Sequence, residues 1–292
     1  GGKYLKNEGF SEDVCLAVAE HYLPSFYKDA LPSSKYGAIV SVADKIETLI
    51  SIFISGKRPS GSSDPYALRR NLNGVIKIIW DYELDLPLEK LFNELIDFWK
   101  IEFPNLDFSK KEVLNDLIEF LVQRIVSHLE EISLSKELIK ALYSSDEFSQ
   151  KRILNIVDLK NRVKSIVNFK EKETFFEIQK VITRVSNLAN SSNLSTEVLS
   201  IGDYVNTKLF EKDCELKVFE FIKELEKLYS KGSCDYLKLL NLFEININTI
   251  EDLFDNEKGV LVMTEDIKVR NNRLNLLSLI RNYSLKIADF TL

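Results

Sequence analysis

Three polar residues on one predicted helix have the types and spacing that bind nucleic acid. Lys180, Arg184 and Asn187 stand at i, i+4 and i+7 within residues 172–190, so a helix there places all three on one face. Lysine and arginine bind phosphates, and arginine and asparagine can hydrogen-bond the edges of unpaired bases. This spacing therefore predicts a candidate RNA-binding face.

The distribution of charge supports that interpretation but leaves a second one open. The 292-residue chain has a formal net charge of −6 at pH 7, yet residues 151–190 carry nine Lys and Arg against four Asp and Glu. Arg270 and Arg273, spaced i and i+3 on a later predicted helix, could add positive charge to the groove in which the RNA would lie. A local positive patch is what a phosphate backbone requires, but basic helix faces are also common as solvated surfaces. Arg184 and Asn187 could instead cap and brace neighbouring helices.

No self-contained catalytic or metal site is predicted. The loop SGKRPSGSSDPYALRR (residues 55–70) contains Gly-Lys, but it follows a helical pattern, and Arg58 stands where a phosphate-binding loop needs Ser or Thr. The sequence has neither G-x-S-x-G nor H-E-x-x-H, and we expect His21 and His128 to be structural residues of helices. Asp44 is the exception, because a carboxylate between small apolar residues on a core helix is costly unless it is paired.

Composition indicates a chain made mostly of regular structure. The sequence is 45% hydrophobic and 29% charged, with only 10 Gly and 6 Pro. No apolar run approaches the roughly 18 residues that a membrane span needs, and no secretory signal pattern is present. We therefore expect a cytoplasmic protein without membrane contact. Its three cysteines, an odd number without a C-x-x-C pair, are expected to be buried and reduced: Cys15, Cys214 and Cys234.

Apolar residues recur at helical spacing through nearly the whole chain, which predicts an all-α, multi-domain protein. Residues 36–54 predict a core helix, and Asp64 and Pro65 are expected to be the N-cap and first position of the next helix. The apolar segment 259–263 is too short to distinguish a strand from a buried turn. Further helices are predicted over residues 87–99, 109–129, 151–168, 172–190, 211–230 and 266–288.

Several stretches resemble the beta subunit of bacterial glycyl-tRNA synthetase. Residues 43–49 (ADKIETL) and 59–70 (PSGSSDPYALRR) are similar to two consecutive motifs of that family, at matching spacing. The stretch TRVSNL (183–188), the block VMTED…VRNNRLNLL (262–277) and the ending KIADF (286–290) resemble its later motifs. The resemblance covers essentially the whole chain. Because those subunits are longer, it implies a C-terminal portion of about two fifths.

The resemblance also implies a domain organisation. Residues 1–60 would be the end of a degenerate HD-like helical domain, residues 61–150 a helical body, and residues 151–292 a DALR-type anticodon-binding domain. Asp44 would occupy the position of the last metal-binding Asp of HD enzymes. Since the His-Asp pair of those enzymes is missing from this chain, no bound metal is expected. The segment 249–259 is longer and more acidic than the family pattern.

The function implied by the resemblance is recognition of glycine tRNA through its anticodon arm. The complete enzyme would join glycine to tRNA with ATP and magnesium, in an alpha2-beta2 assembly whose alpha subunit activates glycine. This chain would bind RNA through Lys180, Arg184, Asn187, Arg270 and Arg273, and would hold no cofactor itself. Two alternatives remain at this stage: a non-catalytic helical interaction scaffold, and a remnant of a metal-dependent HD phosphohydrolase.

Overall fold

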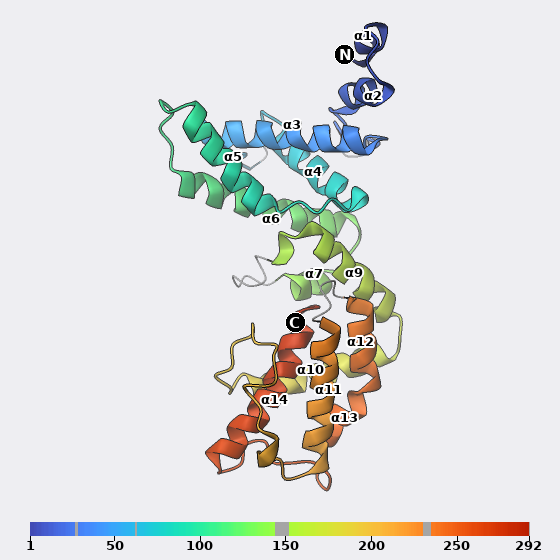
Figure 1. The fold of residues 1–292 in the computed structure, drawn as a ribbon, viewed down its shortest axis with the longest axis vertical. Coiled ribbons are helices and arrows are strands. Elements are labelled where there is room, and N and C mark those ends of the chain that lie inside the picture. Colours follow the sequence, from blue (N-terminus) through green and yellow to red (C-terminus); the bar gives the residue numbers. More distant parts are fainter. Residues whose placement is uncertain (27–28, 62, 144–151, 230–234, 292) are drawn as a thin grey trace. The chain divides into compact units, whose positions relative to one another are not determined.

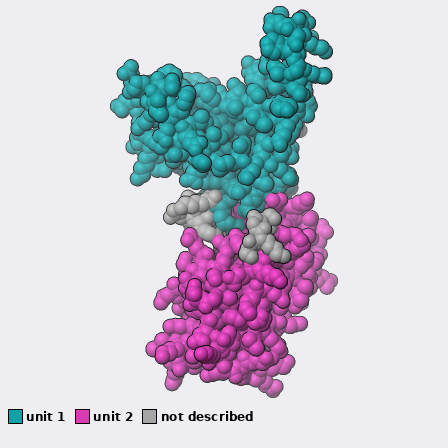
Figure 2. Space-filling view, in the orientation of Figure 1, with its two compact units in different colours: residues 1–139, 143–160 teal, residues 140–142, 161–292 magenta. Residues whose placement is uncertain are grey.

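A computed structural model describes residues 1–26, 29–61, 63–143, 152–229 and 235–291 (Figure 1). Cys234 lies outside them, while Cys15 and Cys214 are buried free thiols, as expected. The described residues form helices and no strand, which confirms the all-α prediction. The chain divides into two compact units: unit 1 comprises residues 1–139 and 143–160, and unit 2 comprises residues 140–142 and 161–292 (Figure 2).

Unit 1 is built on helices that pack mainly through α3. Its elements are α1 (Gly2–Asn7), α2 (Glu12–Glu20), α3 (Lys35–Ile54), α4 (Leu68–Tyr82), α5 (Leu88–Glu102) and α6 (Lys110–Glu131). The predicted apolar face of α3 is buried, since Ile46, Leu49, Ile50 and Phe53 are each at most 1% exposed. Helices α7 (Lys136–Leu142) and α9 (Ile156–Lys170) contribute residues to both units.

Helix α4 begins later than the sequence predicted, although Asp64 still caps it. The helix starts at Leu68, so Pro65 lies in the preceding turn and not at the first helical position. The Asp64 carboxylate accepts hydrogen bonds from the backbone N–H groups of Leu68 (2.8 Å) and Arg69 (3.0 Å). These are two of the four N–H groups that an α-helix leaves without partners at its start. The predicted start was wrong because residues 65–67 form a turn between Asp64 and the helix, and the Asp64 side chain reaches past this turn to the first helical N–H groups.

The sequence placed Asp44 on the core side of its helix, and this was wrong because its neighbour Lys45 takes the buried position. Asp44 is exposed, whereas Lys45 is 4% exposed. The Lys45 ammonium donates to the carbonyls of Tyr22 (3.1 Å) and His21 (3.4 Å) and to the hydroxyl of Ser41 (3.0 Å). Adjacent positions on a helix point about 100° apart, so Lys45 can lie on the buried face while Asp44 points to solvent. Burial lowers the pKa of Lys45, partly offset by Asp44.

Unit 2 is organised around its last helix, α14. Its elements after α9 are α10 (Thr174–Ala189), the 3-10 turn η1 (Thr207–Leu209), α11 (Asp213–Tyr229), α12 (Tyr236–Ile245), α13 (Ile247–Asp252) and α14 (Ile267–Leu285). Helix α14 packs against α10 and α11. Leu276, Leu277, Ser278 and Leu279 are each 0% exposed, and consecutive residues of a helix point about 100° apart, so these four point in different directions around it. Burial on all sides makes α14 the centre of this unit.

The loop before η1 is attached to α14 by hydrogen bonds from side chains. Asn282 donates through Nδ2 to the carbonyls of Ser195 (2.9 Å) and Val198 (2.7 Å), and the Tyr283 hydroxyl donates to the Leu199 carbonyl (2.8 Å). The apolar segment 259–263 is irregular, with a turn at 262–263 and no strand, which resolves the ambiguity left by the sequence.

Candidate nucleic-acid interface on helix α10

Helix α10 is amphipathic, and the three predicted RNA-binding residues share its exposed side. Its buried residues are Ile178, Val181, Ile182, Val185, Ser186 and Ala189. Lys180, Arg184 and Asn187 are all exposed. The structure thus brings these three together as the spacing predicted, and we refer to them as the α10 surface.

An exposed aromatic residue extends the α10 surface towards the start of the helix. Phe176 is 73% exposed and stands four residues before Lys180. At 100° per residue, Phe176, Lys180, Arg184 and Asn187 fall within about 80° of arc. Single exposed apolar side chains are common on protein surfaces, and Phe176 matters here because it shares the face of the three polar residues. Charge-based reading of the sequence missed Phe176, although the same spacing rule would have included it.

Much of the positive charge in residues 151–190 is committed to internal contacts. Arg152 pairs with Asp158 (3.8 Å), Lys160 with Glu83 (2.8 Å) and Lys172 with Glu244 (2.7 Å). Arg162 is 1% exposed, and its Nη1 lies 3.5 Å from the Ile287 carbonyl oxygen. Hydrogen bonds from Lys172 and Thr174 lower the pKa of Glu244. The excess of basic residues therefore overstates the positive charge available to a ligand.

Arg184 is held against an aromatic ring from another part of unit 2. Its guanidinium carbon lies 4.3 Å from the centroid of the Phe254 ring, in a cation–π contact. Phe254 is half-buried and follows α13, inside the segment 249–259 that departs from the family pattern. Across the described ranges, no carboxylate forms an ion pair with Arg184 or Lys180. The long-range contact with Phe254 could not be found from helix spacing.

The segment that carries Phe254 has a defined turn. The Asp255 carboxylate accepts hydrogen bonds from the N–H groups of Glu257 and Lys258, both at 2.8 Å, and these bonds lower the pKa of Asp255. A Cβ added to Gly259 would lie 2.5 Å from the Asp255 carbonyl oxygen and 2.6 Å from the Leu253 carbonyl oxygen. The turn therefore requires glycine at position 259, and it fixes the backbone on both sides of Phe254.

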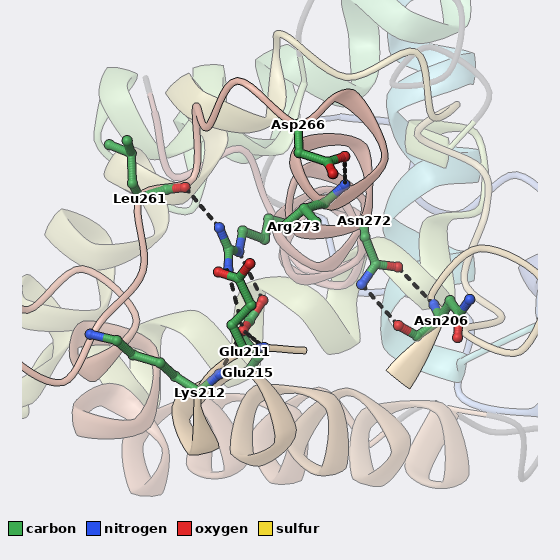
Figure 3. A network of polar contacts seen from close by, with 9 residues as sticks. Asn206, Glu211, Lys212, Glu215, Leu261, Asp266, Asn272 and Arg273 are labelled. Carbon is green, nitrogen blue, oxygen red and sulfur yellow. Dashed lines mark hydrogen bonds and ion pairs between the residues drawn. The ribbon is translucent and has the colours of Figure 1, made fainter. Parts of the chain in front are cut away.

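Arg273, one of the residues predicted to bind RNA, lies inside unit 2. It is 2% exposed, and its Nε donates to Oε1 of Glu215 at 2.9 Å (Figure 3). The same guanidinium donates to Glu211 (2.7 Å) and to the Leu261 carbonyl (3.1 Å). Burial lowers the pKa of Arg273, but the hydrogen bonds that its guanidinium donates to the carboxylates of Glu215 and Glu211 outweigh that effect and raise it. Because its donors face protein acceptors, we leave Arg273 out of the candidate interface.

The other residues of this part of α14 hold neighbouring loops. Arg270 is half-exposed and does not share the burial of Arg273. Asn272 exchanges two hydrogen bonds with the backbone of Asn206, at 2.7 and 3.1 Å (Figure 3). Asn275 donates to the Tyr204 carbonyl at 2.7 Å. The polar residues on α14 thus act mainly as braces of neighbouring loops, a role that the sequence suggested only for Arg184 and Asn187.

The two histidines occupy structural positions. The ring of His21 lies at the end of α2, with Nδ1 2.9 Å from the Val18 carbonyl. His128 is 6% exposed and meets the ring of Trp80 edge to face, with centroids 4.9 Å apart. Burial, assisted by Lys77, lowers the pKa of His128 to about 4. Neither residue belongs to a group that could hold a metal ion, since no three His, Cys, Asp or Glu side chains gather for one anywhere in the described ranges.

No helix within the described part of the chain is long and apolar enough to cross a membrane.

Comparison with known proteins places the chain among longer relatives. A family profile described as "Glycyl-tRNA synthetase beta subunit" matches residues 1–144. The "Glycine--tRNA ligase beta subunit" of Trichodesmium erythraeum (strain IMS101) is 34% identical over 295 residues, covering 99% of this chain and 41% of the relative. The protein of the same name from Thermodesulfovibrio yellowstonii (strain ATCC 51303 / DSM 11347 / YP87) is 34% identical over 293 residues, covering 100% and 39% respectively. The chain spans about two fifths of the length of these relatives.

Proposed function

Because the chain belongs to the glycyl-tRNA synthetase beta subunit family, we propose that its unit 2 binds glycine tRNA. The α10 surface would contact the anticodon arm, with Lys180 and Arg184 on phosphates or bases and Asn187 on a base edge. Anticodon loops expose unpaired bases, which are the usual target of sequence-specific RNA recognition.

The observation that carries this proposal is the shared exposure of three side chains suited to RNA on one rigid helix. Lys180 and Arg184 have no ion-pair partner among the described residues, in contrast to Arg152, Lys160 and Lys172 of the same basic segment. Exposed positive charge that is not neutralised internally can release counterions from a phosphate backbone, which is the main source of nucleic-acid affinity. Arg270, half-exposed on α14, stays a weaker candidate for the same role.

The whole protein would act as a glycine–tRNA ligase. Its relatives carry that name, and we propose that it joins glycine to tRNA using ATP and magnesium together with an alpha subunit, in an alpha2-beta2 assembly. The part described here would supply no catalytic residue and no cofactor ligand. Its contribution would be positioning, because binding energy from the anticodon arm can orient the acceptor end at a distant reaction centre.

The proposal is tested by measuring binding of the 292-residue chain to glycine tRNA and to an unrelated tRNA between 50 and 200 mM salt, a range over which several phosphate contacts change affinity steeply. We expect tighter binding to glycine tRNA, and affinity that falls as salt rises. The variant Lys180→Ala/Arg184→Ala should bind more weakly and show a salt slope shallower by about 1 to 2.

A matched control removes the same charge elsewhere. Lys90 and Lys111 are exposed lysines of unit 1, and Lys90→Ala/Lys111→Ala changes the net charge equally. This control should bind as the unaltered chain does. Equal affinity for both tRNAs, or equal losses in the two double variants, would argue for non-specific attraction and against recognition by the α10 surface. Capture of the alpha subunit without any RNA would favour the scaffold interpretation.

A further inference from the structure

The side chains around the α10 surface include aromatic groups that phosphate binding does not need. Phe176 is 73% exposed on the same face as Lys180, and the guanidinium of Arg184 lies over the ring of Phe254. Eight residues separate Phe176 from Arg184, which places them about 12 Å apart along the helix axis. The face therefore offers two flat groups, separated by two helical turns, with a lysine between them.

The Phe254 ring restricts the Arg184 side chain before any ligand arrives. A free arginine side chain loses considerable rotamer entropy when it is ordered, and a contact that already orders it reduces this loss on binding. The Phe254 backbone is itself fixed by the turn that requires Gly259. Arg184 is exposed, and its planar guanidinium can stack on a second flat π system on the side away from Phe254.

The acidic residues on either side of Phe254, whose ring Arg184 contacts, favour a neutral partner over a phosphate. The segment after Phe254 exposes Asp255 and Glu257, and the preceding turn of α13 ends in the exposed Glu251 and half-exposed Asp252. Carboxylates repel a phosphate backbone laid across them, but they do not oppose an uncharged base. Asn187, one turn further along α10, carries both a donor and an acceptor for a base edge.

We propose that the α10 surface, extended by Phe176 and Phe254, holds unpaired nucleobases by stacking, one on Phe176 and one on the Arg184–Phe254 pair. Asn187 hydrogen-bonds the edge of the base on Arg184, and Lys180 contacts the phosphate between them. This inference rests on the proposed function and specifies its ligand as single-stranded loop nucleotides. It also assigns roles to Phe176 and Phe254, which the motif analysis did not single out.

Base stacking and phosphate contact can be distinguished by substitutions that keep the charge of a side chain but change its shape. Arg184→Lys keeps the positive charge and removes the planar group, while Phe254→Leu removes the ring beneath it. We expect each of these, and Phe176→Ala, to weaken binding of glycine tRNA by about 5-fold or more, since stacking of one base contributes about 5- to 150-fold in affinity. The salt slope should stay unchanged in all three. Lys180→Ala should instead lower the slope by about 1.

Two controls guard against effects of folding and of general hydrophobicity. Phe254→Tyr keeps the aromatic face and should retain affinity, which distinguishes stacking from support of the turn. Tyr4 is 76% exposed in unit 1, and Tyr4→Ala should bind as the unaltered chain does.

The direct readout uses glycine tRNA carrying 2-aminopurine, a fluorescent base quenched by stacking, at single positions of the anticodon loop. Binding of the unaltered chain should change the fluorescence at one or two positions, and Arg184→Lys or Phe176→Ala should each abolish one of these changes. If the unaltered chain binds glycine tRNA specifically but these variants keep its affinity and its fluorescence changes, the stacking proposal is overturned and the proposed function stands. If the unaltered chain binds both tRNAs equally, the proposed function fails, and stacking fails with it.

Discussion

The buried ion pair between Arg273 and Glu215 makes the firmest energetic prediction. Glu215 is fully buried, and Arg273 is 2% exposed, with 2.9 Å between Nε and Oε1. The other carboxylate oxygen of Glu215 accepts hydrogen bonds from the N–H groups of Glu211 (2.7 Å) and Lys212 (3.1 Å), at the start of α11. The pair therefore joins α14 to the beginning of α11, and to the 253–263 segment through the Leu261 carbonyl.

The loss of unfolding free energy in each variant depends on which charge remains buried without its partner. Arg273→Met removes the cation but leaves the Glu215 carboxylate buried, and breaking a buried pair in this way costs about 3–5 kcal/mol of unfolding free energy. Glu215→Gln keeps the side-chain volume and an acceptor for the backbone N–H groups. Arg273 then retains Glu211 and the Leu261 carbonyl, so we expect a smaller loss of about 1–3 kcal/mol.

The double variant tests whether these losses share one cause. With both substitutions no charge remains buried at this point, so the two losses should not add. We expect a coupling energy of about 2–3 kcal/mol, measured by urea unfolding of the whole chain and by hydrogen exchange of the α14 amides. Arg270→Met, on the half-exposed side of the same helix, should change stability by no more than about 0.5 kcal/mol. Additive losses, or an Arg273→Met variant as stable as the unaltered chain, would refute the reasoning.

Two further predictions concern unit 1. His128 stays neutral in the folded chain down to about pH 4, because its pKa is lowered to about 4. In the unfolded chain the same imidazole takes up a proton near pH 6.5. The free energy of unfolding should therefore fall by about 2 kcal/mol from this residue as the pH drops from 7 to 5. His128→Phe should remove that part of the pH dependence in urea unfolding at the two pH values, and an unchanged pH dependence would contradict the assignment. Asp64→Ala should cost about 1 kcal/mol because two N–H groups of α4 lose their acceptor, whereas Asp64→Asn should cost less. If Asp64→Ala leaves the melting temperature unchanged, water must replace the carboxylate as the acceptor for these two N–H groups.

The sequence predicted the helices better than their ends. Apolar spacing located α3, α6, α10 and α14, because burial of one face dominates the choice of residues in a long helix. The start of α4 was predicted too early, because an Asp-Pro pair is compatible both with a helix that begins at once and with a turn that precedes the helix. Helices α12 and α13 were not predicted. Both are short, and α13 begins two residues after α12 ends, so neither presents a long apolar stripe of its own.

The candidate site was predictable where its geometry lies within one helix. The shared face of Lys180, Arg184 and Asn187 follows from spacing alone. The contact of Arg184 with Phe254 joins residues 70 positions apart in the sequence, and no local rule predicts it. The prediction that Arg273 lies on the surface was wrong for the same reason: its partner Glu215 is 58 residues earlier in the sequence, and no local rule predicts that contact. Charge counts alone cannot distinguish a cation that meets a ligand from one that meets a carboxylate inside the fold.

The central claim, that glycine tRNA lies on the α10 surface, is tested most directly by cross-linking. A photoreactive phenylalanine derivative placed at position 176, where the native side chain is exposed, should cross-link to the anticodon loop of glycine tRNA. The same group at position 4, equally exposed in unit 1, should give no cross-link to that loop. Cross-links at both positions, or none at position 176 under conditions where the tRNA is bound, would contradict the account.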